Sequence, residues 1–461
     1  NMNLVADLLC LLACLTMVPC DRVYVHPFNL FSFKESDCDK LEKLLQEGNT
    51  VVPVSIESQT TPEYEGDVND NSKLEAPSAW GKEGWGYLRD LVHILGMRFY
   101  SALQKAQRGQ NVLLSPTSLY SSLVSFYLGA SNQTALDLQG LLGFVPVSGN
   151  PDCTSTAVGN NFLSNLRTIE RVLNTGDKEL LFSRTLSLFT APGIPLFQLF
   201  LEHLLPNADA FYARAVDFTN PGKAAEQINA FLEAKSQGQS KCLLADIDPS
   251  ADLLFAVDVR LAVNIKQAFL LKEPQEFWVD SNKKVLVPML SITGTFKYKT
   301  DANEAFSMVE VPISETAQLV LLQPINGSDL EHMESELTWQ SPAWLQRLSP
   351  REIKLTLPAL TLEDSSDLQE LLADMELPAL LGKGADFSKI SNASITVGKV
   401  INKAFFKLAS DGTDQPEEPT AQKEDGAYLD VTLNKPFLFA VFEKQSKAML
   451  ILGRVVNPLR E

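Results

Sequence analysis

The stretch Asn111-Val-Leu-Leu-Ser-Pro-Thr-Ser118 leads directly into a helical pattern that runs to Leu128-Gly129-Ala130. Upstream, three apolar residues repeat every four positions, as one face of a helix does, at Leu91, Leu95 and Phe99. Further helical patterns follow at 134–142, 162–173 and 224–235. The quoted stretch therefore lies within a predominantly helical first part of the chain.

Strand patterns dominate the later part of the chain. Runs rich in β-formers occur at 181–190, 261–270, 285–289, 307–311, 319–323, 352–362, 428–433, 437–443 and 449–456. A capped helix is expected over Ser366 to Met375, between two of these runs. Helices mainly first and strands mainly later favour an α+β fold with large antiparallel or mixed sheets.

The composition is that of a globular protein with an acidic surface. The 461 residues carry a formal net charge of -18, with 45% hydrophobic and 21% charged residues. A chain of this length can form one large core or two to three ordinary domains. The acidic balance argues against a nucleic-acid partner and against an anionic membrane surface.

The first 20 residues predict a signal peptide. An apolar run from Leu8 to Val18 is too short to span a bilayer, and small residues follow at the expected cleavage point, Val18-Pro19-Cys20. The alternative is a short core helix at the N-terminus. No later segment is long and apolar enough for a transmembrane helix, so we expect a secreted, extracellular protein.

The residues that follow the signal peptide divide into three parts. Residues 21–30 form a short, mostly apolar, extended-looking segment, and 31–87 are expected to be a tail and linker. Within the tail, Ser36 to Gln46 can form a short helix, whereas Thr50 to Gly86 predicts local order at most. The folded body is expected to cover 88–461.

Cysteines and glycosylation sequons agree with an oxidising compartment. Once the signal peptide is removed, Cys38, Cys153 and Cys242 remain, which suggests one disulfide and one spare thiol. The spacing leaves all three pairings open, and Cys153 is expected in a polar loop. Sequons for N-glycosylation begin at Asn132, Asn326 and Asn392.

No pattern in the chain predicts an enzyme. The sequence has no nucleophile elbow, no zinc-protease motif, no phosphate loop and no dinucleotide fingerprint. Its four histidines, His26, His93, His203 and His332, stand in unrelated contexts and are expected to be ordinary packed or surface residues. We therefore expect no catalytic residue, no metal site and no cofactor.

An ordered set of short motifs resembles the serpin family. The stretch 111–118 with Leu128-Gly129-Ala130 resembles the serpin shutter region, and Ile228-Asn-Ala-Phe231, Val287-Pro-Met289, Asn434-Lys-Pro-Phe437 and Gly453-Arg-Val-Val-Asn-Pro458 resemble later landmarks in the right order. The segment 399–413 resembles the strand that leads into the reactive-centre loop. The resemblance implies helices packed around three β-sheets, with an exposed loop resembling a reactive-centre loop, over 88–461.

The hinge after this strand predicts that the serpin body is not inhibitory. An inhibitory serpin inserts its cleaved loop as a new central strand of the main sheet. Here the hinge continues from Gly412-Thr413 to Pro416-Glu417-Glu418-Pro419. Proline cannot donate a ladder hydrogen bond, and neighbouring residues of a strand point to opposite faces, so one glutamate would face the core in either register. An unpaired buried carboxylate is costly, and we therefore reject insertion.

A second departure from the inhibitory pattern lies at Asn402, where many inhibitory serpins carry a histidine behind the main sheet. An asparagine side chain can still donate and accept hydrogen bonds, so this residue alone decides little.

The segment after the signal peptide resembles the angiotensin family of vasoactive peptide hormones. It is Asp21-Arg22-Val23-Tyr24-Val25-His26-Pro27-Phe28-Asn29-Leu30, and it departs from the best-known member only at Val25 and Asn29. The resemblance implies cleavage by renin between Leu30 and Phe31. A converting dipeptidase would then leave Asp21 to Phe28, which acts on a G-protein-coupled receptor and controls blood pressure and fluid balance.

The residues around Leu30-Phe31 suit an aspartic protease. Such an enzyme holds its substrate as an extended strand and sorts alternate side chains into pockets. The recognition residues would be His26, Pro27, Phe28 and Asn29, with Pro27 pre-setting an extended backbone. The plainer interpretation is that this apolar run is a packed strand or tail.

The same resemblance favours a Cys38–Cys153 disulfide, which would tie the tail to the body. This bridge is either a redox gate on renin access or a structural staple. Two other functions stay open as alternatives: a protease-inhibiting serpin, and a serpin that carries a small hormone.

Overall fold

The computed structural model describes residues 43, 48–62, 64–67, 82–144, 151–175, 179–236, 244–300, 306–325, 327, 329–337, 348–377, 380–412 and 428–460. Helical segments in these ranges are α3 (Lys82–Ala106), α4 (Pro116–Gly129), α5 (Asn132–Leu142), α6 (Pro151–Leu173), α7 (Gln198–Leu204), η2 (Leu205–Asn207), α8 (Pro221–Lys235), α9 (Leu330–Leu337) and α10 (Leu368–Asp374). No helix in this part of the chain is long and apolar enough to cross a membrane.

A seven-stranded sheet, called the main sheet below, forms the centre of the body. Its order is β16 (Leu360–Asp367), β17 (Val397–Ser410), β8 (Leu253–Ile265), β5 (Leu180–Thr190), β7 (Ala210–Ala215) and β2 (Val54–Ser55), with β3 (Gly66–Asp67) also paired to β7. β17 and β8 are parallel neighbours at the centre, and β5 is antiparallel to β8. The two short strands at the edge come from the N-terminal tail.

A nine-stranded sheet, called the second sheet, packs beside it. Its order is β18 (Leu429–Thr432), β15 (Ser349–Pro358), β12 (Met289–Thr300), β13 (Phe306–Pro312), β14 (Ala317–Pro324), β19 (Phe437–Glu443), β20 (Met449–Val455) and β4 (Val112–Leu114), with β9 (Phe269–Leu270) on β12. Two-stranded ribbons join β1 (Thr50–Val51) to β6 (Leu196–Phe197) and β10 (Gln275–Trp278) to β11 (Lys284–Val287).

The expected three sheets are thus two large sheets and two small ribbons in the described residues. The reason is β12, whose 12 residues pair with β15 over most of their length and with β13 over the last third. One continuous hydrogen-bonded ladder therefore joins strands that would otherwise form separate sheets. The expected α+β class is confirmed.

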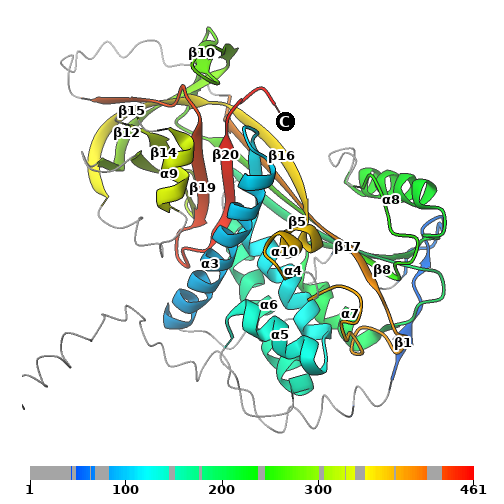
Figure 1. Cartoon of the computed structure of the whole chain (residues 1–461). Helices are drawn as coiled ribbons and strands as arrows, with labels where there is room; N and C mark the ends of the chain where they lie inside the picture. Colours follow the sequence, from blue (N-terminus) through cyan, green and yellow to red (C-terminus); the bar gives the residue numbers. More distant parts are fainter. Residues whose placement is uncertain are drawn as a thin grey trace, which may run out of the picture.

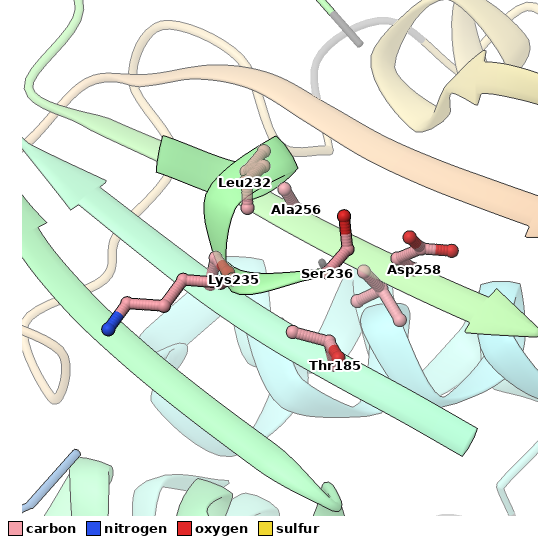
Figure 2. Close-up of a pocket in the computed structure, with 8 residues that line it drawn as sticks. Thr185, Leu232, Lys235, Ser236, Ala256 and Asp258 are labelled. Atoms are coloured by element: carbon pink, nitrogen blue, oxygen red, sulfur yellow. The ribbon is translucent and has the colours of Figure 1, made fainter. Parts of the chain in front are cut away.

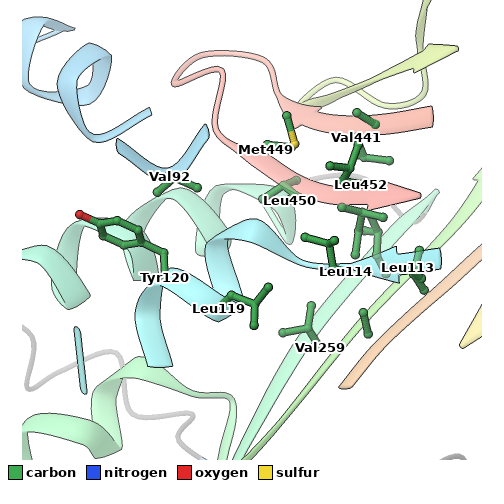
Figure 3. Packing of buried hydrophobic residues seen from close by; sticks show 14 of the residues in the cluster. Val92, Leu113, Leu114, Leu119, Tyr120, Val259, Val441, Met449, Leu450 and Leu452 are labelled. Carbon is green, nitrogen blue, oxygen red and sulfur yellow. The ribbon is translucent and has the colours of Figure 1, made fainter. Parts of the chain in front are cut away.

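The stretch 111–118 joins the two ends of the body. Pro116 begins α4, and the Ser115 side chain caps this helix by accepting from the Ser118 N–H at 3.2 Å. β4 pairs with β20, and the Asn111 side-chain amide donates to the carbonyl of Asn457 at 2.8 Å. Figure 3 shows side chains of β4 and β20 meeting those of α3 and α4 in the core.

Most predicted elements exist, with corrected ends. The helix predicted to run to Gly129 and the strand predicted at 437–443 end at the predicted residues. The single strand predicted at 352–362 is instead β15 and β16, which lie in different sheets. The break falls at Ala359, whose N–H donates to the Pro288 carbonyl at 3.0 Å. The helix predicted from Ser366 begins at Leu368 and is capped by Asp367.

The strand predicted at 261–270 is also divided, into the end of β8 and the short β9. Sequence patterns missed α7, α9 and β7, which are short, and all of the 12-residue β12 except Met289, where the run predicted at 285–289 ends. Helices α3 to α6 group on one side of the main sheet, whereas α8 packs near the opposite side (Figure 1). This places the main sheet between helices.

Candidate functional site

Several predicted functional residues lie outside the described residues. These are the signal peptide 1–20, the peptide 21–30 with its cleavage pair Leu30-Phe31, Cys38, Cys242, Asn326 and the hinge residues Pro416, Glu417, Glu418 and Pro419. The described part of the chain instead shows where the tail joins the body and how the main sheet receives it.

The tail is bound to the body by strand pairing, although its sequence suggested a linker with local order at most. β1 pairs antiparallel with β6, and the Gln198 N–H donates to the Asn49 carbonyl at 2.9 Å. β2 then pairs parallel with β7, and the Ile56 N–H donates to the Ala215 carbonyl at 2.9 Å. In Figure 1 the blue tail runs from β1 near α7 towards α8, and β2 joins the edge of the main sheet.

A buried ion pair secures the tail on this edge. The Arg214 guanidinium on β7 is 2% exposed and lies 2.5 Å from a carboxylate oxygen of Glu65 in the tail. The other Glu65 oxygen accepts from the Ala213 N–H at 3.1 Å, and Arg214 also donates to the Thr60 carbonyl at 3.2 Å. The guanidinium lies over the Phe231 ring of α8, 5.5 Å from its centroid. A charge buried this deeply requires its partner.

Cys153 lies in the first turn of α6, not in the loop predicted for it. Pro151 opens this helix, where its missing N–H costs nothing, and Asp152 suits the positive end of the helix dipole. The Cys153 side chain is 4% exposed and its sulfur is disulfide-bonded. Every other cysteine of the chain lies outside the described residues.

The centre of the main sheet is closed. β17 and β8 pair without interruption from Val400 with Phe255 to Ser410 with Ile265. Gly412 follows in a left-handed conformation, with φ of 79°. A new strand could enter here only after this whole ladder opened.

Asn402 is part of this ladder, on β17, and its side chain points towards α4. Its side-chain oxygen accepts from the hydroxyls of Ser118 at 3.2 Å and Ser122 at 2.8 Å, both on α4. Its amide nitrogen is buried and has no hydrogen-bond partner among the described residues. The sequence allowed this residue both to donate and to accept, but here it only accepts within the part of the chain that the structure describes.

The two described sequon asparagines are exposed. Asn132 begins α5 with φ of 51°, and its side chain donates to Asp386 at 2.8 Å. Asn392 is exposed on the loop before β17. Both asparagines therefore lie at the surface.

The three described histidines lie on three different helices. His93 is on α3, His203 on α7 and His332 on α9. Burial and the nearby charge of Lys389 lower the pKa of His203 to about 4. No group of three metal-ligating side chains occurs in the described ranges. The structure does not bring these histidines together.

Two cavities differ in what they can hold. One lies between α8 and the strands β5 and β8, near Ser236, Thr185 and Asp258, and measures about 20 Å³ (Figure 2). This is room for about one water molecule. The other, about 1120 Å³, lies between α3, α9 and the β10 ribbon, and buried Glu334 and Arg454 line it beside Trp278. Only the second is large enough for a small organic ligand.

Sequence patterns missed the residues that hold the tail and the α6 turn. Glu65 lies in a stretch without periodicity, and Arg214 lies on a strand of six residues that was not predicted. Lys389 is also buried, on the loop between α10 and β17, where a lone lysine is usually solvated. An ion pair across 149 positions leaves no local signal in the sequence.

Comparisons with known proteins cover the whole chain. A family model described as Serpin (serine protease inhibitor) matches residues 91–458. The chain is 40% identical to angiotensinogen of Homo sapiens over 474 residues, which is 100% of this chain and 98% of that protein. It is 37% identical to angiotensinogen of Rattus norvegicus over 470 residues, with 99% of this chain and 98% of that protein covered.

Solved structures agree on the fold. Uncleaved ovalbumin matches with a TM-score of 0.70 and 20% identity, covering 80% of this chain and all of that one. Human thyroxine-binding globulin, complexed with its hormone, matches with a TM-score of 0.69 and 19% identity, covering 82% of this chain and all of that one. At these identities the likeness concerns the fold alone.

Proposed function

The chain belongs to the serpin family and, within it, to the angiotensinogens, and on this premise we propose that it is a secreted precursor of a peptide hormone. The observation that carries the proposal is coverage: the 40% identity to human angiotensinogen extends over 100% of this chain, tail included. The protein is a substrate rather than an enzyme. Renin releases Asp21 to Leu30 by cutting the Leu30–Phe31 bond.

The attached tail limits where this bond can lie. Leu30 stands 19 positions before Asn49, whose carbonyl accepts from the Gln198 N–H, so the chain between them reaches at most about 65 Å. Pairing of Cys38 with Cys153 shortens this tether, because Cys38 stands eight positions past Leu30 and that span reaches at most about 28 Å. The proposed bridge thus keeps the scissile bond near the first turn of α6.

The released decapeptide is then trimmed. A converting dipeptidase removes Asn29-Leu30, and the octapeptide Asp21 to Phe28 acts on a G-protein-coupled receptor. Exposure of Asn132 and Asn392 supports a glycosylated, secreted precursor.

The serpin body does not inhibit proteases in this proposal. The prolines and glutamates at 416–419 cannot occupy a central strand, and the ladder between β17 and β8 is closed at the place where such a strand would enter. The alternative of an inhibitory serpin would need both obstacles to be overcome.

The test is incubation of the purified mature protein with renin, followed by mass spectrometry of the fragments. We expect one early product, Asp21 to Leu30, with the body left whole and no stable protease complex. A covalent complex formed through the loop after Gly412, or absence of the decapeptide, would contradict the proposal.

A second candidate function rests on the larger cavity. Its volume of about 1120 Å³, its buried Glu334–Arg454 pair at 3.3 Å and the nearby Trp278 ring suit an amphipathic aromatic ligand. Thyroxine is a suitable probe because thyroxine-binding globulin shares the fold. Quenching of tryptophan fluorescence by thyroxine that disappears in a Trp278→Leu variant would support carriage, and no quenching would exclude it.

A further inference from the structure

The strand β6, which pairs with the tail strand β1, and the turn of α6 that carries the disulfide-bonded Cys153 both contact one short segment, Asp386 to Ser391, called the 386–391 segment below. On one side it holds β6, the partner of the tail strand β1. The Phe197 N–H donates to the Ile390 carbonyl at 2.9 Å, and the Ser391 hydroxyl donates to the Pro195 carbonyl at 2.5 Å. The β1–β6 pairing of the tail is therefore held by the 386–391 segment.

The same segment is fixed against the helices. The Ser131 N–H donates to the Asp386 carbonyl at 2.9 Å, and the Asp386 N–H donates to the Thr134 hydroxyl at 2.8 Å. Gly129 lies so close that an added Cβ would stand 2.3 Å from a side-chain carbon of Ile390. The segment thus has little freedom to move relative to α4 and α5.

The other side of the segment holds the turn of α6 that carries Cys153. The buried Lys389 ammonium donates to the Asp152 carbonyl at 2.7 Å, to the Thr156 hydroxyl at 3.1 Å and to the Ser155 hydroxyl. The three partners suit both protonation states of the lysine, because an ammonium has three protons to donate, and a neutral amine has two protons and a lone pair that can accept from a hydroxyl. Asp152 directly precedes Cys153, and Ser155 and Thr156 follow it by two and three positions, so one lysine binds the turn on both sides of this cysteine.

We propose that Lys389 is a positioning residue, which holds the disulfide-bearing turn of α6 and the β1–β6 attachment in one arrangement and so sets how the tail presents its cleavage site to renin. This inference rests on the proposed function, including the Cys38–Cys153 pairing. The protease is renin, as in the proposed function, and the new claim is that Lys389 holds the tail in place for it. A tail held in one arrangement loses less conformational entropy when the protease binds.

The charged groups around Lys389 give this arrangement a pH dependence. Burial lowers the pKa of Lys389 to about 7, while the carboxylates of Asp152 and Asp386 favour its charged form. His203 on α7 faces it as a neutral side chain above about pH 4. When the turn opens to water, the lysine regains its ordinary pKa of 10.5. Opening therefore becomes easier as the pH falls towards about 7, and levels off below that.

The experiment compares Lys389→Met with Lys383→Met, a matched control because Lys383 is exposed on the same loop. The full-length protein is treated with a phosphine reductant between about pH 7 and pH 9, and alkylation with mass spectrometry gives the rate at which the Cys153 disulfide opens. We expect Lys389→Met to raise this rate about tenfold at the alkaline end, where the parent turn is most closed. The ratio of the variant's reduction rate to the parent's should shrink towards about pH 7. Taking this ratio also cancels the pH dependence of the reductant itself.

Renin kinetics on the same proteins provide the second readout. We expect Lys389→Met to raise KM roughly threefold with kcat within about twofold, and Lys383→Met to leave both unchanged. If Lys389→Met does not fold, Ser155→Ala with Thr156→Val removes two of the three acceptors and serves in its place. Equal reduction rates in all variants at every pH would overturn the inference.

The two proposals fail in different ways. Absence of the decapeptide from the parent protein refutes the proposed function, whereas the reduction rates still report on Lys389. Release of the decapeptide with KM and reduction rate unaffected by Lys389→Met refutes only the inference.

Discussion

The edge and the centre of the main sheet differ in whether they accept an additional strand. At the edge, β7 accepts two strands of the tail, β2 in parallel and β3 antiparallel, and a buried Arg214–Glu65 pair secures them. At the centre, β17 and β8 form an uninterrupted ladder, and the segment that follows carries two prolines and two glutamates. The serpin body thus accepts strands of the N-terminal tail at the edge of the main sheet. It does not accept the segment after Gly412 as a strand between β17 and β8.

The edge should depend most strongly on its buried ion pair. We expect Arg214→Met to lower the free energy of unfolding by about 3–5 kcal/mol, because it leaves Glu65 charged and unpaired in the interior. Denaturant unfolding measures this change. Lys266→Met is the matched control, because its pair with Glu179 lies at 2.8 Å but the lysine is 73% exposed, and about 0–1 kcal/mol is expected. Equal losses in the two variants would contradict a special role for the edge pair.

The centre should open when its hinge is made compatible with a strand. We expect a variant with alanine at 416–419, once cleaved in the loop, to unfold at a temperature higher by roughly 5 °C or more, since the loop can then enter between β17 and β8. Calorimetry before and after cleavage measures the gain. The cleaved parent protein is the control and should show no gain; a gain in the parent would mean that the centre is not barred by the hinge.

The opposite edge strand, β16, should contribute a pH dependence. Burial raises the pKa of Asp364 to about 6, against hydrogen bonds from the Leu113 and Ser365 N–H groups that favour the charged form. The folded state therefore binds the proton more tightly than the unfolded state, and stability from this group falls as the pH rises from about 4 to 6. We expect Asp364→Asn to gain about 1 kcal/mol at pH 7 and to lose this pH dependence, as denaturant titrations at several pH values would show.

The surface sequons should have the smallest effect. We expect Asn392→Gln and Asn132→Gln each to remove one glycan, seen as a mass difference after glycosidase treatment of the secreted protein. Stability should change by less than about 0.5 kcal/mol for Asn392→Gln, which is an exposed loop residue. An unchanged mass would mean that the position is not occupied.

The sequence predicted the body better than the tail, for reasons of length and periodicity. α4 has 14 residues, a Ser115 cap and a proline at its start, and β19 has seven apolar-rich residues, so local patterns fix both. The tail strands have two residues each, which is too short for any period to show. They exist only because β6 and β7 offer unpaired edges, which is a tertiary property.

The candidate site was predictable only where chemistry is local. The residues at 416–419 exclude insertion of the loop into the main sheet because two are prolines, which cannot donate a ladder hydrogen bond, and two are charged glutamates. Glu65 with Arg214, and Lys389 with the α6 turn, are contacts across more than a hundred positions, and a single sequence carries no pattern for them. Asn402 differs from both. An asparagine side chain is expected to donate as well as accept, but its amide nitrogen has no acceptor among the described residues.

The junction made by Asn111 has a consequence for how the protein is made. Its side chain accepts from the N–H groups of Val456 and Asn457, so it needs partners that the ribosome adds 345 and 346 positions later. The strand β4 likewise waits for β20 before its ladder can form. By contrast, β6 and β7 emerge early, and the tail can dock on them while synthesis continues. The tail strands can therefore dock on a body that is not yet closed, and we expect retention of incomplete chains to depend on β20 and on Val456 and Asn457.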